Sequence, residues 1–172
     1  FRKDSSFIAN FLNCMINELS DKSYLFQNQI VETIYFGGGT PSILPVDFYI
    51  KIFDSIKHHY NLAGSIECTF EINPEHATDD YFRALRDSAF INRLSAGFQA
   101  LSDDGLRYLG RNHSVDDILR YVDLCQKYQF CNFSADYIFG YEILNDKEIE
   151  RSINLLANLG VPHISAYSLG IE

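Results

Sequence analysis

Three consecutive glycines follow a short apolar run in the first quarter of the chain. Residues 31–36 (Val-Glu-Thr-Ile-Tyr-Phe) are mostly β-branched or aromatic, which indicates a strand, and residues 37–39 are all glycine. Glycine lets the backbone take positive φ and approach a ligand closely, Thr40 adds a hydroxyl, and Pro41 fixes the exit. Neither a phosphate loop nor GxGxxG is present, which disfavours these two kinds of nucleotide phosphate binding. A ligand loop and a tight β-to-α turn without a ligand both remain open.

Polar side chains also lie at or near the ends of the later predicted strands. They are Glu71 and Asn73 for the second strand, Gln99 for the third, Asp136 for the fourth, and Ser165, Tyr167 and Ser168 for the fifth. In parallel β/α folds ligands bind at the carboxyl ends of strands, so we expect these groups to converge. An unpaired buried carboxylate is costly, and the partner of Glu71 and Asp136 is therefore a ligand or Arg111. An internal salt-bridge network without a ligand is the alternative.

Apolar periodicity predicts the elements that position these groups. It predicts helices over 5–19, 49–60, 114–128 and 145–159, short helices capped by Thr78 and Ser102, and strands over 31–36, 66–72, 92–98, 133–139 and 163–169. Such alternation indicates an α/β fold with a parallel sheet in sequential order and right-handed crossovers. No composition shift divides the chain, so we expect one domain. Because the chain opens on a helix and closes on a strand, we interpret it as a barrel fragment truncated at both ends, with apolar surface left uncovered there.

Composition narrows the functional class. The chain has 172 residues, of which 47% are hydrophobic, and a formal net charge of −9. An acidic chain argues against binding to nucleic acid or to an anionic membrane surface, both of which select basic patches. The sequence has no apolar run near the roughly 20 residues that span a bilayer, and we do not interpret residues 1–6 as a signal peptide. We expect a cytoplasmic or organelle-matrix setting.

The cysteines and histidines form no recognisable metal motif. Cys14, Cys68, Cys125 and Cys131 have neither CxxC nor zinc-ligand spacing, and we interpret them as reduced structural thiols, three of them inside apolar patterns. His76, His113 and His163 each lack a second ligand residue at helical or strand spacing. We therefore expect these histidines to have packing or capping roles.

Five segments together resemble a known family. They are residues 33–44 (Thr-Ile-Tyr-Phe-Gly-Gly-Gly-Thr-Pro-Ser-Ile-Leu), 71–75 (Glu-Ile-Asn-Pro-Glu), 92–99 (Asn-Arg-Leu-Ser-Ala-Gly-Phe-Gln), 109–113 (Leu-Gly-Arg-Asn-His) and 163–172 (His-Ile-Ser-Ala-Tyr-Ser-Leu-Gly-Ile-Glu). In these segments the chain resembles radical S-adenosylmethionine (SAM) enzymes, and among them the HemW group of haem chaperones, which is related to oxygen-independent coproporphyrinogen III oxidase (HemN). The resemblance covers nearly the whole chain.

The resemblance implies a partial (β/α)6 TIM-like barrel of the radical SAM type, of which this chain covers five parallel strands. In such enzymes a reduced [4Fe-4S] cluster cleaves SAM to a 5′-deoxyadenosyl radical. It further implies haem or porphyrin as a ligand and a haem-accepting protein as a possible partner. By motif, backbone groups of Gly38, Gly39 and Thr40 would meet the methionine end of SAM. The cavity would also be lined, in some relatives around a second SAM, by Glu71, Gln99, Arg111, Asp136 and the Gly170 backbone.

Three departures from the family pattern keep other functions open. The cluster motif CxxxCxxC would precede Phe1, so we expect the cluster ligands to lie outside this chain. Residues 139–144 read Phe-Gly-Tyr-Glu-Ile-Leu where relatives usually have Tyr-Gly-Leu-Pro-Gly-Gln, and the chain ends before the histidine-containing haem motif of HemW relatives. The segments 71–75 and 109–113 favour the chaperone. The alternatives are oxidative decarboxylation of coproporphyrinogen III and a degenerate barrel that binds a partner without cofactor chemistry.

Overall fold

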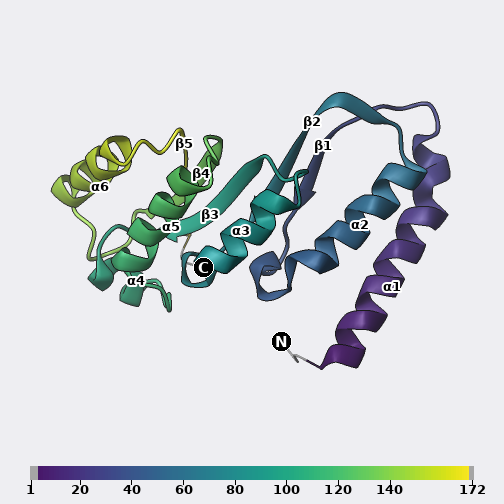
Figure 1. Cartoon of the computed structure of the whole chain (residues 1–172). Coiled ribbons are helices and arrows are strands. Elements are labelled where there is room, and N and C mark those ends of the chain that lie inside the picture. Colours follow the sequence, from purple (N-terminus) through teal and green to yellow (C-terminus); the bar gives the residue numbers. More distant parts are fainter. Residues whose placement is uncertain (1–3, 171–172) are drawn as a thin grey trace. The chain divides into compact units, whose positions relative to one another are not determined.

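Figure 1 shows a computed structural model of the chain, which describes residues 4–170. The strands are β1 (Val31–Phe36), β2 (Leu62–Glu71), β3 (Arg93–Gln99), β4 (Phe133–Phe139) and β5 (His163–Ser168). The α-helices are α1 (Ser5–Lys22), α2 (Val46–His59), α3 (Asp79–Asp87), α4 (Asp103–Tyr108), α5 (Val115–Lys127) and α6 (Asp146–Asn158). Short 3-10 helices are η1 (Ser23–Phe26), η2 (Pro41–Ile43) and η3 (Pro74–His76). Within residues 4–170 no helix is both long and apolar enough to cross a bilayer.

The strands form one sheet in the order β1-β2-β3-β4-β5. β2 pairs with β3, β3 with β4 and β4 with β5, each time in parallel. Parallel neighbours need a crossover connection, and the intervening helices supply it. The predicted fold class, an α/β partial barrel with sequential parallel strands, is confirmed.

Most predicted boundaries hold to within a few residues. β1 and β4 have the predicted limits, whereas β2 begins at Leu62 instead of Ile66. α2 begins at Val46 instead of Tyr49, directly after Pro45, because proline is tolerated at a helix start. The predicted N-caps are confirmed, since side chains of Thr78, Ser102, Ser114 and Asn145 each accept a backbone N–H of the helix that follows.

Residues 4–34 and 44–67 form one compact unit. In it the Phe11 ring stacks on Phe48 of α2, with centroids 5.9 Å apart, and the Tyr60 hydroxyl donates to the Leu19 carbonyl at 2.8 Å. The helix α1 buries none of its residues, and Phe7 and Phe11 remain 51% and 42% exposed. This agrees with the expectation of uncovered apolar surface on the first helix.

Residues 35–43 and 68–170 form the second unit, which contains the predicted site. Its core is centred on Tyr121 of α5, which meets Phe82 and Phe98 edge to face at centroid distances of 5.5 Å each. Phe133 of β4 packs edge-on against the same ring at 6.1 Å. Edge-to-face packing of large buried rings holds α5 against β3 and β4, so the ends of these strands have defined positions.

Candidate functional site

A cavity of about 170 Å³ lies in the second unit at the carboxyl ends of the strands. Its lining is polar and consists of Gly39, Glu71, Ile72, Asn73, Ser95, Gly97, Gln99, Arg111 and Asp136. We call it the strand-end cavity. Residues that are far apart in the sequence thus meet where a parallel sheet presents its ligands.

The strand-end cavity brings together five of the eight predicted site residues. They are Gly39, Glu71, Gln99, Arg111 and Asp136. Gly38 and Thr40 flank Gly39 but do not line the cavity, and Gly170 lies in an exposed segment after β5. For these three residues the ligand role stays a prediction.

Two carboxylates face this cavity, and they interact. Burial raises the pKa of Asp136 above its usual range, and the negative charge of Glu71 raises it further, while a hydrogen bond from Ser165 acts in the opposite direction. The carboxylate of Glu71 accepts a 2.8 Å hydrogen bond from the Tyr35 hydroxyl. Two acidic groups in one half-buried cavity favour a ligand that brings positive charge.

Arg111 does not neutralise the carboxylates of Glu71 and Asp136. Its side chain is exposed, and among residues 4–170 it forms no ion pair with a carboxylate within 4.0 Å. An internal pairing of Arg111 with Glu71 or Asp136 is therefore absent from the described residues. The guanidinium stays available to a negatively charged group.

The glycine loop presents bare backbone. Gly38 and Gly39 have φ of 82° and 83°, in the left-handed region, and no atom lies within 4 Å of where a Cβ would stand on either. A side chain at these two positions is strained by the backbone conformation, and the open space suits close approach of a ligand. Gly37 differs, because a Cβ there would stand 2.5 Å from Tyr35 Cε1 and 2.9 Å from Glu71 Oε1.

β3 delivers three cavity residues from one face. Ser95, Gly97 and Gln99 alternate with core residues along the strand, and the register of β3 on β4 shifts between Gly97 and Gln99. Gln99 takes a φ of 65°, and its amide nitrogen lies too close to the position of a Cβ on Gly97 for that atom to fit. The glycine therefore gives the Gln99 side chain its place over the strand.

Sequence reasoning missed Tyr35, Ser95 and Gly97. Strand alternation from Gln99 would have found Ser95 and Gly97, because side chains two residues apart share a face. No sequence signal pointed to Tyr35, whose partner Glu71 is 36 positions away in the chain.

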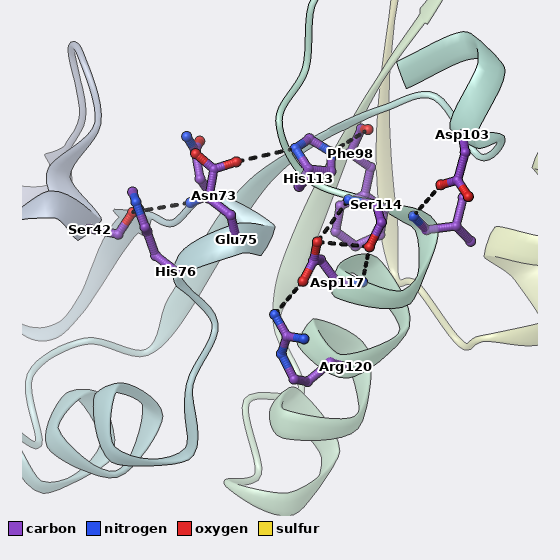
Figure 2. Close-up of polar contacts among 11 residues, drawn as sticks. Ser42, Asn73, Glu75, His76, Phe98, Asp103, His113, Ser114, Asp117 and Arg120 are labelled. Carbon is purple, nitrogen blue, oxygen red and sulfur yellow. Dashed lines mark hydrogen bonds and ion pairs between the residues drawn. The ribbon is translucent and has the colours of Figure 1, made fainter. Parts of the chain in front are cut away.

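A second set of polar contacts lies beside the cavity (Figure 2). Ser42 contacts His76 and the Asn73 backbone, and His113 contacts the Phe98 carbonyl and Glu75. The same view shows the Ser114–Asp117 cap, with Arg120 paired to Asp117. His76 and His113 thus bind other polar groups in place of a metal ligand set, while His163 is exposed.

The described residues do not fit an iron–sulfur cluster. No group of three or more His, Cys, Asp or Glu side chains in residues 4–170 is placed to hold a metal. Cys68 and Cys125 are buried, and burial raises the pKa of each thiol to about 12, whereas Cys14 and Cys131 are exposed. The sequence predicted three cysteines in apolar surroundings, but only Cys68 and Cys125 of the described residues are buried. Cys14 is exposed because α1 buries none of its residues, and Cys131 lies in the loop before β4.

The segment that departs from the family pattern is ordered into a turn. The Leu144 amide donates to the Tyr141 carbonyl at 3.0 Å, and the buried Tyr141 ring stacks on Tyr108 with centroids 5.3 Å apart. This segment and α4 line a larger groove of about 520 Å³, which shares no lining residue with the strand-end cavity.

Residues 17–156 match the family model described as the Radical SAM superfamily. The chain is 30% identical to the haem chaperone HemW of Bacillus subtilis over 96% of this chain and 44% of that protein. It is 31% identical to HemW of Escherichia coli over 95% of this chain and 43% of that protein. The chain thus spans less than half the length of these relatives.

The solved structure of coproporphyrinogen III oxidase (HemN) from Escherichia coli, a radical SAM enzyme, has the same fold. It superposes with a TM-score of 0.85 over 98% of this chain and 38% of the oxidase, at 20% sequence identity.

Proposed function

Because the chain belongs to the radical SAM superfamily, we propose that the complete protein binds SAM in the strand-end cavity, holds one [4Fe-4S] cluster and acts as a HemW-like haem chaperone. In this proposal residues 1–172 are part of one radical SAM core domain. The observation that carries the SAM site is the pair of carboxylates, Glu71 and Asp136, that share one cavity and form no ion pair with Arg111 in residues 4–170.

SAM matches this donor set group by group. Its sulfonium and ammonium are cationic, so they relieve the repulsion between Glu71 and Asp136, and its ribose hydroxyls donate to carboxylates. Its carboxylate suits the exposed guanidinium of Arg111, because arginine binds carboxylates with two parallel hydrogen bonds. The amides of Asn73 and Gln99 and the backbone at Gly39 supply neutral donors and acceptors.

The iron–sulfur cluster needs ligands other than those described. The described cysteines are either buried or isolated, so the proposal assigns the cluster to cysteines outside residues 4–170. A reduced cluster, when bound, supplies the electron that cleaves SAM in this superfamily. The gene sequence before Phe1 tests this assignment, because a CxxxCxxC motif is expected there.

The haem chaperone function is supported by the HemW relatives, whose similarity covers nearly all of this chain. The haem ligand and the haem-accepting protein are assigned to the complete protein. The two alternative functions are the oxidation of coproporphyrinogen III and the binding of a partner protein without a cofactor.

The decisive experiment is a SAM titration of the anaerobically reconstituted complete protein by calorimetry. We compare wild type with Glu71→Gln/Asp136→Asn, and use Glu67→Gln/Asp123→Asn as a matched control, because Glu67 and Asp123 are exposed and do not line the cavity. Loss of charge-assisted hydrogen bonds predicts a SAM affinity at least about tenfold weaker in the cavity variant and unchanged in the control. Equal affinity in the two double variants would remove the cavity as the SAM site.

A second measurement separates the family functions. A haem-binding absorption spectrum is expected for the complete protein, and turnover of coproporphyrinogen III is not. Turnover without haem binding would favour the oxidase, and absence of SAM, cluster and haem binding would favour the degenerate barrel.

A further inference from the structure

Four polar side chains outside the strand-end cavity connect the loops that contribute its lining residues (Figure 2). They are Ser42, Glu75, His76 and His113, which we call the loop-linking network. All four lie in the second unit, and none of them lines the strand-end cavity.

Ser42 connects the glycine loop to the end of β2. Its side chain is buried, with the residue 5% exposed, and its Oγ accepts a 3.1 Å hydrogen bond from the backbone N–H of Asn73. The same oxygen lies 2.8 Å from His76 Nδ1. The backbone N–H of Asn73 uses one lone pair of the Ser42 oxygen. The hydroxyl proton of Ser42 remains free to be donated to the imidazole of His76. One hydroxyl therefore holds the segment after Gly39 against Asn73, and both of these residues line the cavity.

His113 connects the Arg111 loop to the end of β3. The imidazole is buried, and its Nε2 lies 3.2 Å from the Phe98 carbonyl oxygen. A carbonyl only accepts, so Nε2 carries the proton of this hydrogen bond. Phe98 directly precedes Gln99, and His113 follows Arg111 by two positions, so the bond fixes two cavity segments relative to each other.

Glu75 closes the connection. Its Oε2 lies 3.6 Å from His113 Nδ1, an ion pair when the imidazole is protonated, and Glu75 adjoins His76 in η3. The contacts thus form one path from the glycine loop through η3 to the Arg111 loop and β3. Loops carry a large conformational entropy, and fixing them before a ligand arrives increases its affinity.

We propose that Ser42 and His113 are positioning residues that hold the glycine loop, Gln99 and Arg111 in the geometry that binds SAM, an inference that rests on the proposed SAM site. Neither residue lines the strand-end cavity. Their effect is on the arrangement of backbone segments that do.

The first test substitutes Ser42 in the complete protein. Ser42→Ala leaves the backbone N–H of Asn73 without its hydrogen-bond acceptor. We expect the SAM affinity to fall about tenfold, which is equivalent to about 1.4 kcal/mol of binding free energy. The matched control is Ser55→Ala, because the buried Ser55 hydroxyl has no hydrogen-bond partner within residues 4–170. Affinities are measured well below the melting temperature of each variant, so that partial unfolding does not contribute.

The second test uses two amides of different reach at His113. The Gln amide nitrogen reaches the place of Nε2 and preserves the donor to Phe98, whereas the Asn amide reaches only the place of Nδ1. We expect His113→Gln to bind SAM within about threefold of wild type, and His113→Asn to bind about tenfold more weakly. A merely structural role for the imidazole would give both variants a lower melting temperature and the same SAM affinity.

Amide hydrogen exchange of the ligand-free protein gives a readout that does not depend on SAM. Ser42→Ala should increase exchange in residues 37–43 and 73–76, and Ser55→Ala should not. If wild type fails to bind SAM, the proposed SAM site is wrong, and the exchange data then decide whether the network orders these loops. Unchanged affinity together with unchanged exchange in Ser42→Ala would overturn the positioning role.

Discussion

The Tyr35 hydroxyl donates a 2.8 Å hydrogen bond to Oε1 of Glu71. Tyr35 lies near the end of β1 and Glu71 ends β2, so the bond joins the ends of two neighbouring strands. It fixes the direction of a cavity carboxylate. Gly37 belongs to the same arrangement, because any Cβ there would collide with both partners. The first glycine of the loop is therefore favoured by a contact within the protein, whereas Gly38 and Gly39 face open space.

Removing the Tyr35 hydroxyl should weaken SAM binding with little effect on folding. In Tyr35→Phe we expect about tenfold weaker binding, since a hydrogen bond to a charged group contributes about 1.5 kcal/mol or more. Tyr35 is 57% exposed, so the melting temperature should stay near that of wild type. Calorimetric titration with Tyr24→Phe as the control checks this, because Tyr24 is 61% exposed and lies outside the cavity. An unchanged SAM affinity would mean that the Glu71 carboxylate keeps its orientation without the hydrogen bond from Tyr35.

Adding a methyl group at Gly37 should cost stability, and adding one at Gly64 should not. A Cβ at Gly37 would stand 2.5 Å from Tyr35 Cε1 and 2.9 Å from Glu71 Oε1, so these side chains must move and their hydrogen bond, which contributes about 1 kcal/mol, is disturbed. A Cβ at Gly64 has no atom within 4 Å, and Gly→Ala at a compatible site stabilises by about 0.4–1 kcal/mol. Urea unfolding of Gly37→Ala and Gly64→Ala measures the difference. Equal midpoints for the two variants would contradict the close packing around Gly37.

Asp136 should make the ligand-free protein less stable as pH rises. Its pKa in the folded chain is raised above 3.8, mainly by burial and then by Glu71, so between these two pKa values the folded state holds more protons than the unfolded state. Stability contributed by this group is therefore lost as pH increases through that window. Asp136→Asn removes the titration, and its melting temperature relative to wild type should increase from pH 4 to pH 7.

SAM binding should show the complementary trend. A cationic ligand favours the ionised carboxylate, so wild type should bind SAM more tightly as pH rises through the raised pKa of Asp136, while Asp136→Asn should bind more weakly and with less pH dependence. Paired thermal scans and titrations at several pH values check both trends. If Asp136→Asn unfolds readily at neutral pH yet binds SAM normally, Asp136 is a structural partner and not a ligand residue.

The sequence by itself determined the elements and their order. Apolar periodicity and capping residues are local signals, and they predicted the α-helices and the strands, but not the 3-10 helices, as well as the N-caps at Thr78 and Asn145. Alternating strands and helices then implied a sequential parallel sheet. Strand alternation also separates Asp136, which lines the cavity, from its buried neighbours Ala135 and Tyr137 on the opposite face of β4.

Only the tertiary structure decided which polar groups meet. Tyr35 and Glu71 are 36 positions apart, and Ser42 and His76 are 34 apart, so no periodicity relates them. The shift between Gly97 and Gln99, and with it the place of the Gln99 amide, depends on how β3 pairs with β4. Whether Arg111 pairs with a carboxylate depends on the distance between its guanidinium and that carboxylate in the folded chain. Such contacts are set by strand register and by how helices pack on the sheet, and these arise from many side chains at once, which no short stretch of sequence contains.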